Sequence, residues 1–153
     1  MGDWAKGEFT AAGKVPGVDY YCAATPSNNG YLYNVDSFIF YKSSDPDKQA
    51  GQKLLAKLMM GKNFQKVFNL YKGSIPARLD VSMDEFDKCA KTSNSDIKTS
   101  GAKGGLLPSF AHGMAQGNTM KAALQDVITE HFNSDMSSRD AANALADSVL
   151  QNM

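Results

Sequence analysis

The feature that most constrains the fold is a short apolar run, Phe-Ile-Phe-Tyr at residues 38–41. A strand that is apolar on both faces is buried in a sheet covered by other elements. We therefore predict a buried strand over residues 36–41. One other strand is indicated, over residues 18–22, and a two-stranded ribbon alone is marginal. The sequence thus predicts an incomplete sheet, with further strands encoded outside this chain.

Helix signals occupy much of the remaining chain. Apolar residues at helical spacing, with Gly13 as a stop, predict a short helix over residues 2–12. Asp45 followed by Pro46 is typical of a capped helix start. We expect that helix to run to a break at Gly61.

The middle of the chain is predicted to alternate between helices and connectors. A second helix is expected to end at Gly73 and to form a helical hairpin with the first. Residues 74–81 form an irregular connector, after which Ser82 and Glu85 indicate a capping box for a helix that contains Cys89. The Ser-, Lys- and Gly-rich residues 92–107 are predicted to be a surface loop.

The last third is predicted to be helical. Helices are expected over residues 108–112 and 118–132, and Ser137 with Asp140 is expected to cap a final one. An Asn-Gly pair within residues 26–30 favours a tight turn.

Composition excludes several classes of protein. Hydrophobic residues make up 42% and charged residues 21%, as in soluble globular domains. The 16 Lys and Arg balance the 16 Asp and Glu, which argues against nucleic acid or anionic lipid as partner and favours a neutral or weakly charged ligand. Apolar stretches are only a few residues long, so no membrane-embedded segment is expected. The first residues lack the pattern of a secretory signal.

Cys22 and Cys89 are the only cysteines. Their separation excludes a CxxC redox pair and a zinc knuckle, both of which need clustered ligands. Two interpretations remain open: a disulfide, if the compartment is oxidising, or two reduced and buried thiols.

Several sequence motifs occur in a characteristic order along the chain. The motifs are MGDWAKGEF from Met1, NVDSF from Asn34, KGSIPAR from Lys72 and PSFAHG from Pro108. Together they resemble the C-terminal half of extracellular solute-binding proteins for sugars, most closely the glucose-binding members, over essentially all 153 residues.

This resemblance implies a helix-rich α/β fold, the C-terminal part of a two-lobe, type II-like periplasmic-binding-protein fold with segments of both lobes. It places residues 1–33 in one lobe and a hinge crossing, and residues 34–71 in the other lobe. Residues 72–153 then form a hinge crossing and a helical segment of the first lobe.

The resemblance also implies a sugar site. It puts Trp4 at the sugar-stacking position and Asn34, Asp36, Lys72 and His112 at hydroxyl-binding positions. The chemistry agrees, because an indole suits the apolar face of a pyranose. Sugar hydroxyls both donate and accept, so carboxylate, ammonium and amide groups suit them.

Each of these residues also has an ordinary structural interpretation. Trp4 could be core packing, Asn34 and Asp36 could turn the chain, and Lys72 could complement a helix dipole. His112 could be a partly buried histidine. No second ligand lies at metal-binding spacing from it, so we predict no metal and no cofactor.

The resemblance implies a periplasmic protein that binds a monosaccharide, glucose in our interpretation. It would act together with the missing N-terminal part of the same protein. In this role it would deliver the sugar to an inner-membrane ABC permease. A glycosidase is disfavoured because it needs two carboxylates and the constellation holds only Asp36, so we predict no enzyme. The alternative is a helical interaction module completed by a partner chain, and a domain-swapped dimer is conceivable for the isolated chain.

Overall fold

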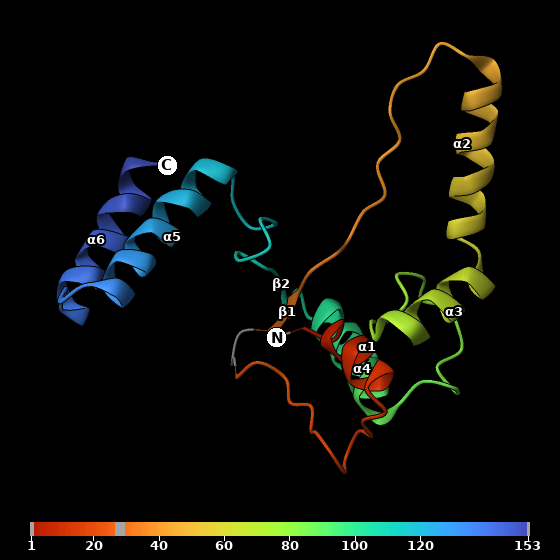
Figure 1. Ribbon diagram of the computed structural model, residues 1–153, viewed down its shortest axis with the longest axis horizontal. Helices are drawn as coiled ribbons and strands as arrows, with labels where there is room; N and C mark the ends of the chain where they lie inside the picture. Colours follow the sequence, from red (N-terminus) through yellow and green to blue (C-terminus); the bar gives the residue numbers. More distant parts are fainter. Residues whose placement is uncertain (1, 27–29, 153) are drawn as a thin grey trace. The chain divides into compact units, whose positions relative to one another are not determined.

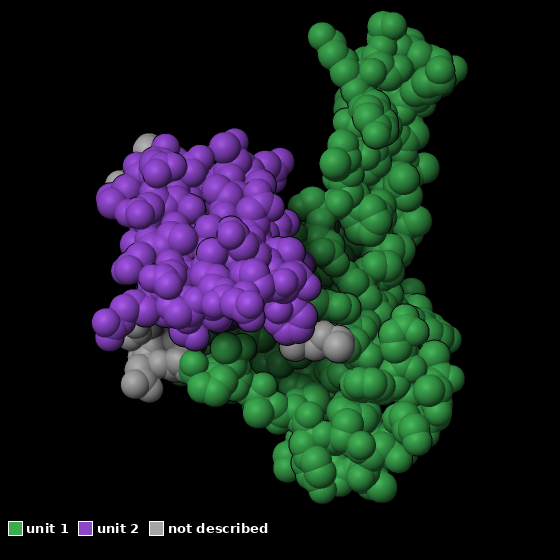
Figure 2. All heavy atoms as spheres, turned by 60° about the vertical axis from the view of Figure 1, so that its left-hand side comes forward, with its two compact units in different colours: residues 1–31, 35–106 green, residues 32–34, 107–153 purple. Residues whose placement is uncertain are grey.

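A computed structural model describes residues 2–26 and 30–152 (Figure 1). The described residues divide into two compact units, distinguished by colour in Figure 2: residues 2–26, 30–31 and 35–106 form the first, and residues 32–34 and 107–152 form the second. The elements in chain order are α1 (Ala5–Ala11), β1 (Tyr31–Tyr33), α2 (Pro46–Met59), α3 (Lys62–Lys72), α4 (Lys88–Ala102), β2 (Leu106–Pro108), α5 (Asn118–Asn133) and α6 (Ser138–Gln151). The lobe boundaries expected at residues 33 and 71 stay a prediction.

The helices α1, α2 and α3 form where local signals predicted them. Asp45 caps α2 by accepting hydrogen bonds from the N–H groups of Asp47 and Lys48, at 2.9 and 3.3 Å. Gly73 ends α3 in the left-handed conformation, with φ of 83°. Helix ends expose unpaired backbone groups, and these residue types satisfy them without distant contacts.

The expected helical hairpin does not form. Leu54 and Leu58 on the apolar side of α2 are 70% and 60% exposed. Figure 1 shows α2 and α3 leaving their joint in different directions. α2 therefore does not bury its apolar face against α3.

The predicted strands over residues 18–22 and 36–41 are wrong. Residues 36–41 are extended without regular structure, and Ile39 is 79% exposed. Around residue 20 there is only an isolated bridge between Pro16 and Tyr20. An extended segment becomes a strand only when a neighbour takes up its backbone hydrogen bonds, and among the described residues the strands of the sheet pair with each other.

The observed sheet consists of β1 and β2. The N–H of Tyr31 donates to the carbonyl of Gly105, and the N–H of Ser109 donates to the carbonyl of Tyr33, both at 2.8 Å. Residue numbers rise together along both strands, which is the pattern of a parallel pair. The sheet thus joins segments far apart in the sequence.

The surface loop predicted over residues 92–107 is wrong. These residues form most of α4 and the start of β2. The helix begins after Asp87, whose carboxylate accepts the N–H of Ala90 at 2.7 Å. Ser82 does not cap it, since its hydroxyl donates to Asp84 instead. Ser, Thr and Gly are weak helix formers, but tertiary contacts at the start of α4 override that preference.

Two long-range contacts fasten the start of α4. Cys22 and Cys89, which are 67 positions apart in the sequence, form a disulfide with their Cα atoms 5.7 Å apart. Lys6 of α1 is only 4% exposed, and its ammonium lies 3.3 Å from both carboxylate oxygens of Asp87. Both contacts tie the first 22 residues to the same helix end.

The second unit is built on α5 and α6, which lie side by side in Figure 1. Ser137 caps α6 by accepting the N–H of Asp140, as predicted. The helix expected over residues 108–112 does not form, because Pro108 ends β2 and the N–H of Ser109 is bonded to the sheet. The turn expected over residues 26–30 falls largely on residues 27–29, outside the described part.

Candidate functional site

Two of the predicted site residues, Asp36 and Lys72, lie in direct contact. Lys72 occupies the last turn of α3, and its ammonium pairs with the Asp36 carboxylate. The ammonium also lies 5.7 Å from the centre of the Phe68 ring. An exposed ion pair of this kind presents a donor and an acceptor next to each other, which is what adjacent hydroxyl groups require.

A cluster of aromatic rings beside Lys72 was not assigned to the site from the sequence. The Phe68 ring centre is 6.2 Å from that of Phe38 and 5.4 Å from that of Phe64, on which it stacks. Phe64, Phe68 and Lys72 recur at intervals of four, which places them on one face of a helix. That spacing was the signal available in the sequence.

Trp4 lies at the start of α1, as the residue that precedes its first turn. It is 37% exposed, so the indole is partly covered and partly accessible. α1 packs against α3, the helix that carries Lys72. The first unit thus holds Trp4, Asp36 and Lys72.

The other two predicted residues, Asn34 and His112, belong to the second unit. Asn34 directly follows β1, and His112 lies in the turns that follow β2. Both therefore come after the carboxyl ends of parallel strands, which is where α/β sheets place their ligands. The hydrogen bond from the Ser109 N–H to the Tyr33 carbonyl brings the two segments together, although Asn34 and His112 are 78 positions apart in the sequence.

Ser109 is a functional candidate that sequence reasoning missed. It is 4% exposed, and its hydroxyl lies 2.7 Å from Nδ1 of His112. This contact holds the imidazole by one nitrogen. The order Ser-x-x-His in the motif was the available signal.

Arg78, the last residue of the KGSIPAR motif, makes structural contacts. Its guanidinium donates to the Asp80 carboxylate at 2.7 and 2.8 Å and to the Met60 carbonyl at 3.2 Å. Hydrogen bonds from Arg78 are the main cause that holds the pKa of the Asp80 carboxyl well below its usual range. A hydrogen bond from Lys62 is the next largest cause. Arg78 thus braces the connector against the end of α2.

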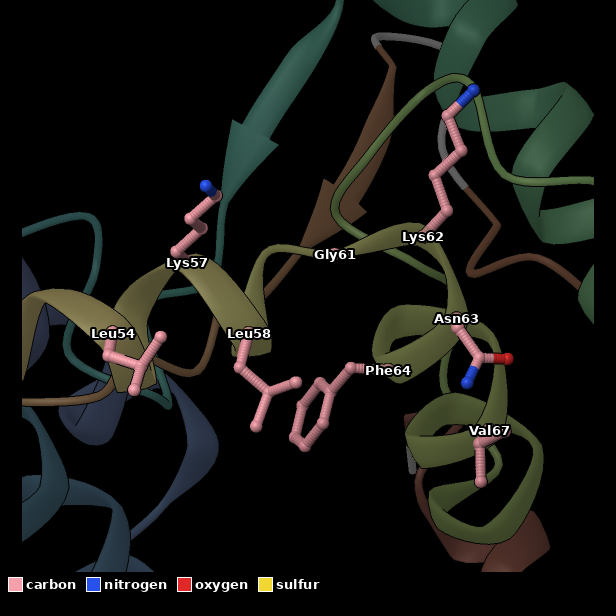
Figure 3. A pocket seen from close by; sticks show the side chains of 8 residues that line it. All are labelled: Leu54, Lys57, Leu58, Gly61, Lys62, Asn63, Phe64 and Val67. Carbon is pink, nitrogen blue, oxygen red and sulfur yellow. The ribbon is translucent and has the colours of Figure 1, made fainter.

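A hollow of about 590 Å³ lies at the joint between α2 and α3 (Figure 3). Leu54, Leu58, Phe64 and Val67 form its apolar walls. None of the predicted site residues lines it. Figure 3 shows Leu58 and Phe64 pointing toward each other across the joint.

The part of the chain that the structure describes has no helix long and apolar enough to cross a membrane.

No family model matches the sequence. Comparison with curated proteins does find relatives. The chain is 45% identical over 97% of its length to a "Probable sugar-binding periplasmic protein" of Brucella suis.

Two archaeal proteins are also similar along almost the whole chain. An uncharacterized ABC transporter extracellular-binding protein of Pyrococcus horikoshii is 35% identical over 99% of it. The Xylose/arabinose-binding protein XacG of Haloferax volcanii is 28% identical over the same share. The chain covers 35%, 34% and 32% of the Brucella, Pyrococcus and Haloferax proteins respectively.

The extent of identity confirms the resemblance that the motifs indicated. A helix-rich chain with a small sheet is compatible with a fragment of such a protein. Along almost its whole length the chain is therefore similar to extracellular solute-binding proteins of ABC transporters for sugars, and it spans about a third of the length of its curated relatives.

Proposed function

We propose that the whole protein binds a monosaccharide, glucose in our interpretation, in a cleft between two lobes and delivers it to an ABC permease. The identity to proteins named as sugar-binding carries this proposal. Because these relatives are binding proteins, the proposal involves no chemical conversion of the sugar. Closure would follow from contacts that the sugar makes only when both lobes surround it.

The Lys72–Asp36 pair supports a hydroxyl-binding role for this part of the chain. In the absence of sugar the two charges satisfy each other, so neither is left without a partner. A sugar hydroxyl can insert by accepting from the ammonium and donating to the carboxylate. Each hydrogen bond to a charged group would contribute about 1.5–3 kcal/mol, which favours sugars that place a hydroxyl there.

Trp4 supports the same proposal from the apolar side. Its ring is large, rigid and partly exposed, so it can cover the C–H face of a pyranose. Asn34 and His112 would add mixed donors and acceptors for further hydroxyls.

A periplasmic location agrees with both the relatives and the disulfide. The Brucella relatives are named periplasmic. The Cys22–Cys89 bridge fits an oxidising compartment, where such bonds persist.

Calorimetric titration of a hexose and pentose panel into the full-length protein that carries this sequence tests the proposal. We expect binding of glucose, its loss in Asp36→Ala, and strong weakening in Lys72→Met. Lys66→Met is the matched control, because Lys66 lies on the same helix and pairs with Glu85 at 2.8 Å. If no sugar of the panel binds, the proposed function is wrong. Binding of a pentose in place of glucose would correct only the ligand.

A further inference from the structure

The contact between α1 and α3 depends on glycine in α1. A Cβ atom on Gly7 would lie 2.8 Å from the carbonyl oxygen of Lys72 and 2.9 Å from that of Tyr71. Both obstacles are backbone atoms at the end of a helix, and they cannot swing aside as a flexible side chain can. Glycine at position 7 is therefore what admits this approach of the two helices.

The same contact constrains Gly73 from the side of α3. Its φ of 83° favours glycine, and a Cβ there would lie 2.6 Å from the Gly7 nitrogen and 2.9 Å from the Asp3 carbonyl oxygen. The first turn of α1 thus rests directly on the residue that ends α3. Figure 1 shows α1 lying against that end of α3.

The indole of Trp4 depends on a second glycine. A Cβ on Gly2 would overlap the six-membered part of the indole ring. The ring therefore occupies the space that a side chain at position 2 would need. Any larger residue there has to push the indole to another place.

Contacts fix both the backbone and the ammonium group of Lys72. Its ammonium pairs with Asp36 and lies near the Phe68 ring, while its backbone carbonyl meets Gly7. The approach of α1 consequently sets where Trp4 stands relative to Lys72. A sugar that stacks on the indole and bonds to Lys72 would require that relation to be fixed.

We propose that Gly2 and Gly7 are positioning residues of the sugar site. Gly7 lets α1 reach the carbonyl end of α3, and Gly2 lets the indole settle over the backbone. The ligand class is a pyranose with an apolar face for Trp4 and hydroxyls for Lys72 and Asp36. The inference rests on the proposed function.

The test compares Gly7→Ala with Gly51→Ala in the full-length protein labelled with 5-fluorotryptophan. Alanine is ordinarily the better helix former, and nothing lies within 4 Å of a Cβ on Gly51 in α2. Loss of one ¹⁹F signal in Trp4→Phe assigns the resonance of Trp4. Without sugar, Gly7→Ala should shift that resonance and Gly51→Ala should not. An unchanged resonance in a folded Gly7→Ala protein overturns the inference.

Sugar titration then separates this inference from the proposed function. We expect Gly7→Ala to weaken binding about tenfold, since misplacing an aromatic platform loses its stacking contribution, while Gly51→Ala binds as the wild type does. If the wild type binds and Gly7→Ala binds equally well, the inference alone falls. If the wild type binds no sugar of the panel, both the proposed function and this inference are wrong.

Gly2→Ala keeps the test decisive should Gly7→Ala fail to fold. It lies before α1, so it should leave the melting temperature unchanged while it shifts the Trp4 resonance and weakens binding by about the same factor. Loss of affinity without loss of stability distinguishes positioning from a general role in folding. Wild-type affinity and an unshifted resonance would overturn the proposal.

Discussion

Two regions of the first unit differ sharply in how they are held. α1, the end of α3 and the start of α4 are fixed by a disulfide, a buried ammonium with its carboxylate, and a backbone contact between glycines. Residues 35–60, by contrast, carry large apolar side chains that are exposed, Ile39 among them. The fastened region contains Trp4 and Lys72, whereas the exposed region contributes Asp36.

The difference shows where this chain supplies its own partners. The fastened region gains its order from contacts between residues more than 60 positions apart. Residues 35–60 are rich in apolar residues, but apolar side chains stabilise a fold only to the extent that they are removed from water. Four experiments can break or sharpen this contrast.

The largest effect is expected from the disulfide. Replacing both Cys22 and Cys89 with Ala should lower the free energy of unfolding by about 4 kcal/mol, because the bridge closes a long loop and restricts the unfolded chain. Denaturant titration of the oxidised, reduced and substituted proteins measures it. Equal midpoints for all three would mean that the bridge does not hold this region.

Truncation of apolar residues compares the two regions directly. Phe86 is 5% exposed, so Phe86→Ala should cost about 3 kcal/mol in this chain. Ile39→Ala should change the free energy of unfolding by no more than about 0.5 kcal/mol, since its side chain already meets water. Chemical denaturation of both variants provides the measurement. A similar cost at the two positions would remove the contrast.

The buried ammonium should matter less than the core but more than a surface pair. Lys6→Ala leaves Asp87 without its ionic partner and should cost about 2 kcal/mol, below the cost of a fully buried pair because Asp87 is partly exposed and still accepts the Ala90 N–H. Lys14→Ala, which removes an exposed pair with Asp19, should cost less than about 0.5 kcal/mol. Thermal unfolding of both variants checks the order. Equal costs would contradict the fastening role.

The smallest effect is expected at Asp80, through pH. Its pKa in the folded state lies below its unfolded value, chiefly because of hydrogen bonds from Arg78. Its contribution is therefore complete above the unfolded pKa of about 3.9 and is lost as pH falls through the lower, folded value. Asp80→Asn should flatten the acid side of the stability curve, as should Arg78→Met. Denaturant midpoints at successive pH values measure this, and an acid limb unchanged in both variants would contradict it.

The motifs in the sequence indicated the resemblance and supplied Asp36 and Lys72, which the structure brings into contact, as a shared role in binding requires. They did not single out Ser109, because the order Ser-x-x-His is a weak signal until the hydroxyl is seen beside the imidazole. The roles of all five predicted residues remain predictions until a sugar is titrated.

The sequence by itself determined the elements whose signals are local. Asp45-Pro46, Gly73 and Ser137 mark helix ends because their side chains or backbone conformations satisfy neighbouring groups, and each end lies where expected. Such contacts span only a few residues, so a short window of sequence contains both partners.

Only the tertiary structure decided the strands, the continuation of α4 through residues 92–102 and the contact of α1 with α3. Tyr31–Tyr33 became a strand because residues 105–109 supply its hydrogen bonds, and the more apolar residues 36–41 found no such neighbour among the described residues. α4 formed in a sequence of weak helix formers because Lys6 and Cys22 fix its start, through Asp87 and Cys89. Lys6 and Cys22 are far from α4 in the chain, and their pairing depends on a geometry that local propensity does not contain.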